Sequence, residues 1–151
     1  MNIITLGTDE HMLDKGSRQY QRILSYAEQV DGYTAIVFSK KAKDFNIDDS
    51  SKLRLIQIPY KQVVRGLYKA YKLFKKENKP DTLVSSQDPF EVGMLSYLFS
   101  KALKKPLHVQ VHTSIESPYF KRESLRHSIQ YDLSRFILKR AKSIRVVSNR
   151  I

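Results

Sequence analysis

The stretch TLVSSQDPFEVGMLSYLFSKALKKPLHVQVHT, residues 82–113, has the pattern of a strand, a helix and a second strand. Its first strand is the β-prone run 82–85, and the apolar run 107–111 forms the second. Between them, apolar residues recur at helical spacing. Two strands joined by a helix in this way form a βαβ unit, so the stretch predicts a parallel sheet.

The helix of this unit has a marked start. Asp88 is expected to cap it, and Pro89 suits its first position. Glu91, three residues after Asp88, is expected to complete a capping box. The residues expected to pack on the sheet are Val92, Leu95, Phe99, Ala102 and Leu103.

The rest of the chain alternates in the same way. Further strands are expected at 2–6, 33–38, 53–58 and 143–147, and segment 39–52 is expected to be a surface loop. Further helices are expected at 17–30, 62–78 and 117–141, the last with Leu125, Ile129, Leu133 and Phe136 facing inward. This alternation predicts an α/β, Rossmann-like, doubly wound parallel sheet with helices on both faces, in a single domain spanning residues 1–151.

The composition is that of a basic globular protein. Lys and Arg number 27 against 15 Asp and Glu, and the net charge of +12 favours nucleic acid, anionic membranes or phosphorylated ligands as partners. There is no cysteine, which excludes disulfides and thiolate chemistry. No run of about 18 apolar residues is present, and the chain begins on a strand rather than a signal peptide. These features predict a cytoplasmic location.

Four polar residues are candidates for ligand binding where strands end. In open α/β sheets, ligands bind beyond the carboxyl ends of the strands. Gln87 and Asp88 follow the first strand of the βαβ unit, His112 follows its second strand, and His11 lies in the loop after the first strand of the chain. The imidazole of His112 can bind a substrate hydroxyl or transfer a proton, and the alternative is a structural histidine that binds the loop backbone.

The first strand-to-helix loop carries Lys15, Gly16 and Ser17 directly before a helix. A glycine there lets the backbone approach a phosphate, and the start of a helix favours an anion. The alternative is a glycine that serves only the geometry of the turn. Neither the P-loop pattern nor the GxGxxG dinucleotide pattern is present.

The expected helix at 62–78 has a basic side. Its cations recur at spacings of four, three and four and are Arg65, Lys69, Lys72 and Lys76. Such a stripe suits an anionic bilayer surface or the phosphates of a nucleic acid, and a solvated helix face is the common alternative. No helix-turn-helix, zinc-finger or RNP-type pattern accompanies it.

The sequence predicts neither a metal site nor a nucleophilic triad. His108 and His112 are four residues apart on an expected strand, which is too far to share a metal readily. Asp44, Asp48 and Asp49 form no DxD pair, and no GxSxG motif is present.

Several motifs together resemble the N-terminal domain of GT-B glycosyltransferases of the family 4 type. They are NIITLG at 2–7, DKGS at 14–17, VSSQDPFEVG at 84–93, VQVHT at 109–113 and AKSIRVVSN at 141–149. By this resemblance the chain is the N-terminal half of a GT-B fold. Gly16 is then the loop glycine whose backbone meets the donor diphosphate, and His112 contacts the transferred sugar. Gln87, Asp88 and His11 are then acceptor-binding residues.

The resemblance also implies that a donor-binding domain with an E-x7-E motif is missing from this sequence. Ser148 and Asn149 look like the cap of a further helix, which is also expected of a fragment. The full protein would be a retaining, nucleotide-sugar-dependent glycosyltransferase. Its acceptor would be a hydroxyl compound such as a lipid-linked or cell-envelope polysaccharide. The donor would be a co-substrate, with no metal or other cofactor, and the 151 residues alone would be inactive.

By the same resemblance, the basic residues Arg65, Lys69, Lys72 and Lys76 would hold the protein peripherally on the inner face of the cell membrane. The alternative function is a non-enzymatic α/β module that binds nucleic acid or another polyanion through this helix. A different Rossmann-like phosphosugar enzyme, such as an epimerase, is a weaker alternative because the dinucleotide pattern is missing.

Overall fold

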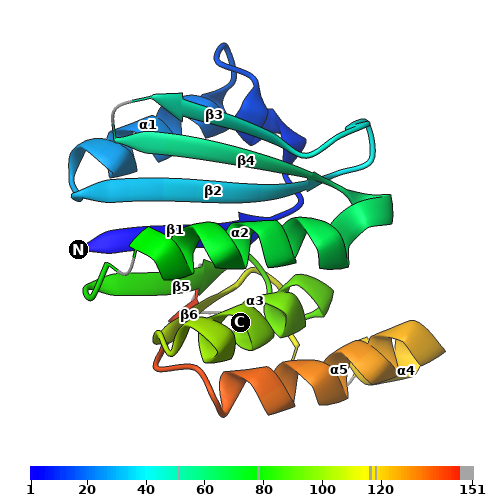
Figure 1. The fold of residues 1–151 in the computed structure, drawn as a ribbon. Helices are drawn as coiled ribbons and strands as arrows, with labels where there is room; N and C mark the ends of the chain where they lie inside the picture. The colour runs from blue at the N-terminus through cyan, green and yellow to red at the C-terminus, as the bar shows by residue number, and fades with distance from the viewer. Residues whose placement is uncertain (51, 78, 116, 118, 147–151) are drawn as a thin grey trace. The chain divides into compact units, whose positions relative to one another are not determined.

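A computed structural model describes residues 1–50, 52–77, 79–115, 117 and 119–146 (Figure 1). The chain divides into two compact units, residues 1–83 and residues 84–151. The strand β5 (Thr82–Ser86) begins in the first unit and continues into the second. Val147, Ser148 and Asn149, which complete the expected last strand and the expected cap, lie outside the described residues.

The first unit is an open sheet with a helix on each face. Its elements are β1 (Asn2–Gly7), the short 3-10 helix η1 (Glu10–Leu13), α1 (Arg18–Glu28), β2 (Gly32–Ser39), β3 (Asn46–Ser50), β4 (Leu53–Pro59), the 3-10 helix η2 (Tyr60–Gln62) and α2 (Val63–Glu77). The strand order is β3-β4-β2-β1. β1, β2 and β4 are parallel, and β3 runs antiparallel to β4.

One face of this sheet packs on α1. Strand side chains alternate between faces, and Tyr33, Ala35 and Val37 of β2 point to the same side. They join a buried core cluster with Tyr20 and Ile23 of α1. The apolar side of the helix predicted at 17–30 is therefore buried against the sheet.

The opposite face packs on α2 through very small residues. Gly66 and Ala70 are the buried residues of α2. A Cβ atom added to Gly66 would overlap Cγ2 of Ile58 in β4 and would lie 3.1 Å from its Cγ1. Helices thus cover both faces of this sheet, which confirms the predicted doubly wound arrangement for this unit.

The antiparallel strand β3 was not expected, because its segment looked like a loop. All of its residues are exposed, and they pair with β4 from Asn46 opposite Gln57 to Ser50 opposite Leu53. An edge strand exposed on both faces lacks the apolar alternation that identifies strands in a sequence. Arg54 of β4 also holds it by an ion pair with Asp49 at 2.9 Å.

The second unit continues the α/β pattern with parallel strands. Its elements are β5, α3 (Glu91–Leu103), β6 (Leu107–Val111), α4 (Phe120–Glu123), α5 (Leu125–Leu138) and β7 (Ser143–Val146). The strand order is β5-β6-β7, and each neighbouring pair is parallel. The βαβ unit predicted at 82–113 is therefore present, and the α/β, Rossmann-like fold class is confirmed.

The start of α3 differs in detail from the expectation. The helix begins at Glu91, not at Pro89, and Asp88 accepts a hydrogen bond from the backbone N–H of Phe90 at 2.8 Å. Glu91 forms no capping box, since its carboxylate binds side chains of α5 instead. Ala102, expected on the sheet side, is exposed.

The long helix expected at 117–141 is two helices. Ser124 has an extended backbone (φ −161°, ψ 162°) that ends α4, and its hydroxyl accepts a hydrogen bond from the N–H of His127 at 3.1 Å. A serine at this position is a strong N-cap, and it starts α5.

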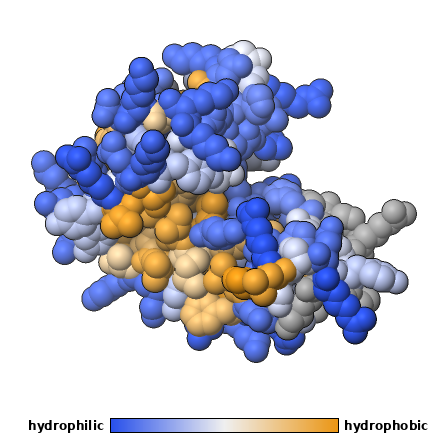
Figure 2. All heavy atoms as spheres, turned by 90° about the vertical axis from the view of Figure 1, so that its right-hand side faces the viewer, coloured by the Kyte–Doolittle hydropathy of each residue, from blue (hydrophilic) through white to orange (hydrophobic). Residues whose placement is uncertain are grey.

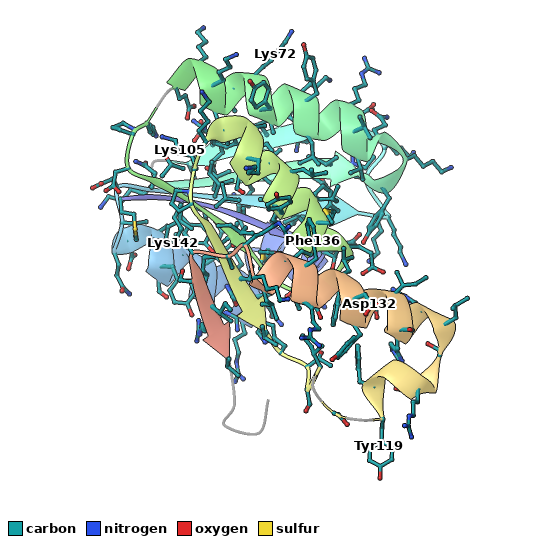
Figure 3. The ribbon with its side chains drawn as sticks, turned by 90° about the horizontal axis from the view of Figure 1, so that it is seen from below. Lys72, Lys105, Tyr119, Asp132, Phe136 and Lys142 are labelled. Carbon is teal, nitrogen blue, oxygen red and sulfur yellow. The ribbon has the colours of Figure 1, made fainter. Side chains whose placement is uncertain are left out.

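The predicted inward face of α5 is wrong. Leu125 is 81% exposed, Ile129 is 61% exposed, and Phe136 is also on the surface. The ring of Phe136, labelled in Figure 3, lies nearly perpendicular to the ring of Tyr97 in α3, with ring centroids 5.7 Å apart. The buried residues of α5 are Gln130, Ser134 and Ile137.

Small residues on α3 explain this reversal. Gly93, Ser96 and Ser100 are buried in α3. A Cβ atom on Gly93 would lie 3.1 Å from Cδ1 of Ile137 and 2.8 Å from the carbonyl oxygen of Asp88. α5 therefore packs closely against α3 through the side that carries Gln130, Ser134 and Ile137, and Leu125, Ile129 and Phe136 remain outside.

A glycine comparison tests the close packing of α2. Overpacking a core costs about 1–3 kcal/mol. Alanine gains only about 1 kcal/mol over glycine in a helix. Gly66→Ala is therefore expected to lower the free energy of unfolding, measured by urea denaturation. In the Ile58→Ala background, Gly66→Ala should lower the free energy of unfolding by a smaller amount, because the methyl group that overlaps the new Cβ atom is absent.

Gly16→Ala is the matched control for this comparison. Its added Cβ would meet only Oδ1 of Asp14 at 3.5 Å, and Gly16 has no positive φ. Its stability should equal that of the parent or exceed it by a few tenths of a kcal/mol, up to about 1 kcal/mol. Equal effects at positions 16 and 66 would contradict the close packing of α2 on β4.

Candidate functional site

The second unit places Asp88 and His112 at the carboxyl ends of two neighbouring parallel strands. β5 ends at Ser86 and β6 ends at Val111, and the two strands pair in parallel. Asp88 is half-buried and His112 is exposed. They are close enough for the charge of His112 to act on the Asp88 carboxyl. The structure thus brings together two of the residues that the sequence singled out, with Gln87 beside them.

The carboxyl group of Asp88 is held in an unfavourable environment for its charge. Burial raises its pKa above the ordinary value of 3.8, and the charge of Glu91 acts in the same direction. The backbone N–H groups of Phe90 and Gly93 and the charge of His112 oppose this rise in pKa. Carboxyl groups with a raised pKa at a strand end are characteristic of binding and catalytic sites.

Glu91, three residues after Asp88, joins α3 to α5 through its carboxylate. Its two carboxylate oxygens accept hydrogen bonds from Nε2 of Gln130, both at 3.1 Å, and Arg126 lies 3.4 Å away. Burial alone would raise the pKa of Glu91, but these partners and its own backbone N–H hold the pKa below its usual 4.5. Sequence reasoning missed this contact, since no local pattern links residues 39 positions apart.

The first unit places Gly16 and His11 in one loop. The N–H of Gly16 donates to Oδ1 of Asp14 at 3.0 Å, and Ser17 caps α1 by accepting from the N–H of Tyr20. The hydroxyl of Ser17 also donates to the carbonyl oxygen of His11, whose side chain is exposed. The predicted phosphate-binding N–H is therefore occupied by a carboxylate of the same loop.

Glu10 is a polar group of this loop that sequence reasoning did not find. Its Oε1 accepts hydrogen bonds from the hydroxyl of Ser39 at 2.7 Å and from the N–H of Lys40 at 2.8 Å. These bonds lower the pKa of Glu10, the Ser39 bond most strongly. The contact joins the loop after β1 to the end of β2, and a partner 29 residues away leaves no local signal.

The basic residues of α2 lie on its outer side. Arg65, Lys69, Lys72 and Lys76 are all exposed. Two exposed apolar residues, Val64 and Tyr68, accompany them. Figure 2, in which the right-hand side of Figure 1 faces the viewer, shows hydrophobic side chains exposed among hydrophilic ones on that side of the molecule.

His108 has a structural contact between strands. Its Nδ1 lies 2.9 Å from the hydroxyl of Ser143, which joins β6 to β7. Burial lowers its pKa below 6.5, and the charge of Arg145 adds to this effect.

Within the part of the chain that the structure describes, no group of three or more His, Cys, Asp and Glu side chains is arranged to hold a metal ion. The described helices also include none with the length and apolarity needed to cross a membrane.

No protein-family model matches this chain, and comparisons with curated proteins and with solved structures gave no match either. The resemblance to family 4 glycosyltransferases therefore rests on the sequence motifs alone.

A titration tests the proximity of Asp88 and His112. Removing the side chain of His112 in His112→Ala should raise the pKa of the Asp88 carboxyl further, because an interaction that lowers it is gone. NMR of the side-chain carboxyl carbon measures this pKa. His108→Gln is the control, since His108 lies about 13 Å farther back along β6. An unchanged pKa in His112→Ala would contradict the pairing.

The pH dependence of stability tests the environment of Asp88. A carboxyl whose pKa is raised by folding costs no stability below its unfolded pKa. The cost grows as pH rises through the folded pKa and is complete above it. Asp88→Asn should remove this loss of unfolding free energy, which sets in as pH rises above the ordinary carboxyl pKa of 3.8. A variant that loses stability above this pH as the parent does would contradict the raised pKa.

Proposed function

We propose that this chain is the acceptor-side domain of a nucleotide-sugar-dependent glycosyltransferase of the family 4 type. The observation that carries the proposal is the position of Asp88 and His112 just beyond adjacent strand ends of a Rossmann-like sheet. Ligands of open α/β sheets bind at this edge. A half-buried carboxyl and an exposed imidazole are suited to bind the hydroxyl groups of a sugar or an acceptor.

In the proposed reaction, the bond between the sugar anomeric carbon and the donor diphosphate breaks. A new bond forms from that carbon to the acceptor oxygen, and the proton of the acceptor hydroxyl passes to the departing diphosphate. His112 binds the transferred sugar, and Asp88 and Gln87 bind the acceptor. Stabilising the departing diphosphate provides most of the rate enhancement, and metal coordination is not part of the proposal.

The role proposed for Gly16 requires one rearrangement. A diphosphate that binds the N–H of Gly16 must displace the carboxylate of Asp14, which now accepts that hydrogen bond. Neither the backbone conformation nor the surrounding space requires glycine at this position. A glycine without a structural need is compatible with the close approach of a ligand.

The outer face of α2 favours a second candidate function, a non-enzymatic module that binds polyanions. Its exposed cations would serve either function, as a membrane anchor of a transferase or as the main binding surface of such a module.

Transfer assays on the full-length gene product test the first proposal. Release of nucleoside diphosphate is measured with UDP-, GDP- and ADP-sugars, with and without hydroxyl acceptors. His112→Ala is expected to lower kcat by roughly a hundredfold or more, since it removes a contact to the reacting sugar. Gly16→Ala should weaken turnover while leaving stability intact, and Lys142→Gln is the surface control.

The chain of 151 residues assayed alone should show no transfer. Turnover by these residues alone would contradict their assignment as only the acceptor side. Full activity of the His112→Ala variant would show that His112 does not contact the transferred sugar. A full-length protein that releases no nucleoside diphosphate from any of these donors would exclude the transferase and leave the polyanion-binding module.

A further inference from the structure

We propose that the outer face of α2 docks this protein on bilayers that contain anionic phospholipids, with Val64 and Tyr68 inserted among the lipid headgroups. The inference does not depend on the proposed transferase activity, because it rests on the shape and charge of one helix.

An apolar ridge runs along the outer side of α2. Val64 is 83% exposed and Tyr68 is 56% exposed. They are four residues apart, so they lie one turn apart on the same side of the helix. The buried Gly66 and Ala70 hold the opposite side against the sheet, so this ridge points away from the core.

Cations surround the ridge. From Lys61 to Lys76 the sequence has six basic residues and no acidic one; the basic residues are Lys61, Arg65, Lys69, Lys72, Lys75 and Lys76. The first acidic residue after them, Glu77, already pairs with Arg54 at 2.7 Å. The outer side of α2 therefore carries exposed cations from Arg65 to Lys76, among them Lys72, which is labelled in Figure 3.

Aromatic rings lie beneath several of these lysines. Lys72 Nζ is 4.8 Å from the centre of the Tyr68 ring, and Lys75 Nζ is 5.5 Å from that of Tyr71. Lysine stems that lie along apolar surface with the ammonium outward, together with tyrosines, are typical of residues at a membrane interface.

The neighbouring loop enlarges the basic surface. Lys69 Nζ is 5.0 Å from the centre of the Phe45 ring in the loop before β3, and Gln62 donates to the carbonyl oxygen of Lys43 at 3.4 Å. Lys40, Lys41 and Lys43 of this loop are exposed, and Asp44 is its acidic residue. The loop therefore adds positive charge beside the start of α2.

The exposed valine favours a bilayer over nucleic acid as the partner. Phosphate backbones are bound by cations and polar groups, and an apolar ridge in the centre of the surface adds nothing there. At a bilayer, transfer of the ridge out of water lowers the free energy of binding, and the cations contact anionic headgroups. The exposed apolar stripe of α5 is less suited to insertion, because Asp132 lies exposed between Ile129 and Phe136.

Vesicle binding by the 151-residue chain tests this inference. Sedimentation with phosphatidylcholine vesicles, with and without phosphatidylglycerol, gives the partition coefficient, and binding is expected only with the anionic lipid. The partition coefficient should fall about a hundredfold, at roughly fivefold per cation, in the triple variant with Lys61→Gln, Lys72→Gln and Lys75→Gln. Val64→Ser should lower it on the order of tenfold.

Matched controls separate this surface from the general charge of the protein. Lys101→Gln, Lys139→Gln and Lys142→Gln together remove the same net charge from exposed sites in the second unit. This triple variant should keep most of the vesicle binding. Circular dichroism confirms that each variant remains folded.

Three results would overturn the inference. The first is no binding to phosphatidylglycerol vesicles. The second is an equal loss of binding in the two triple variants. The third is tighter binding to duplex DNA or RNA than to vesicles, with Val64→Ser having no effect, which would instead assign the surface to nucleic acid.

Discussion

The close approach of α2 to β4 is the constraint on which the first unit and its surface depend. Because Gly66 has no side chain, the helix lies directly against Ile58, and only Ala70 is buried beside it. The large and charged residues of α2 must then occupy its sides and its outer face. The same contact that completes the core therefore presents Val64, Tyr68 and a row of cations to the surroundings.

Close packing on small residues also shapes the second unit. Small residues on α3 let α5 approach closely, and the carboxylate of Glu91 binds Gln130 at their junction. This junction lies next to Asp88, whose charge is destabilised by burial. The half-buried carboxyl group of Asp88 accepts a hydrogen bond from the N–H of Phe90 at the start of α3, and the exposed His112 follows the neighbouring strand. A role for this pair in binding remains a prediction.

The sequence predicted the features that depend on local pattern, and it failed where partners are distant. Asp88 and His112 follow adjacent strands, as the sequence predicted, because neighbouring parallel strands end at the same edge of the sheet. The predicted face of α5 was wrong, because apolar spacing suggested that Leu125 and Ile129 were inward, whereas the helix buries Gln130, Ser134 and Ile137. The exposed β3 and the contacts of Glu91 had no local signal. The roles of Gly16 and His112 toward a donor remain predictions.

The depth at which each residue of α2 meets a bilayer tests the central claim most directly. Lipids that carry a spin label broaden the backbone amide signals of nearby residues in NMR spectra of the protein on anionic bilayer discs. The broadening is predicted to be strongest at Val64 and Tyr68 and weaker at Leu125 and Ile129 of α5. Broadening that is strongest at α5, or uniform along the chain, would contradict the assignment of α2 as the docking surface.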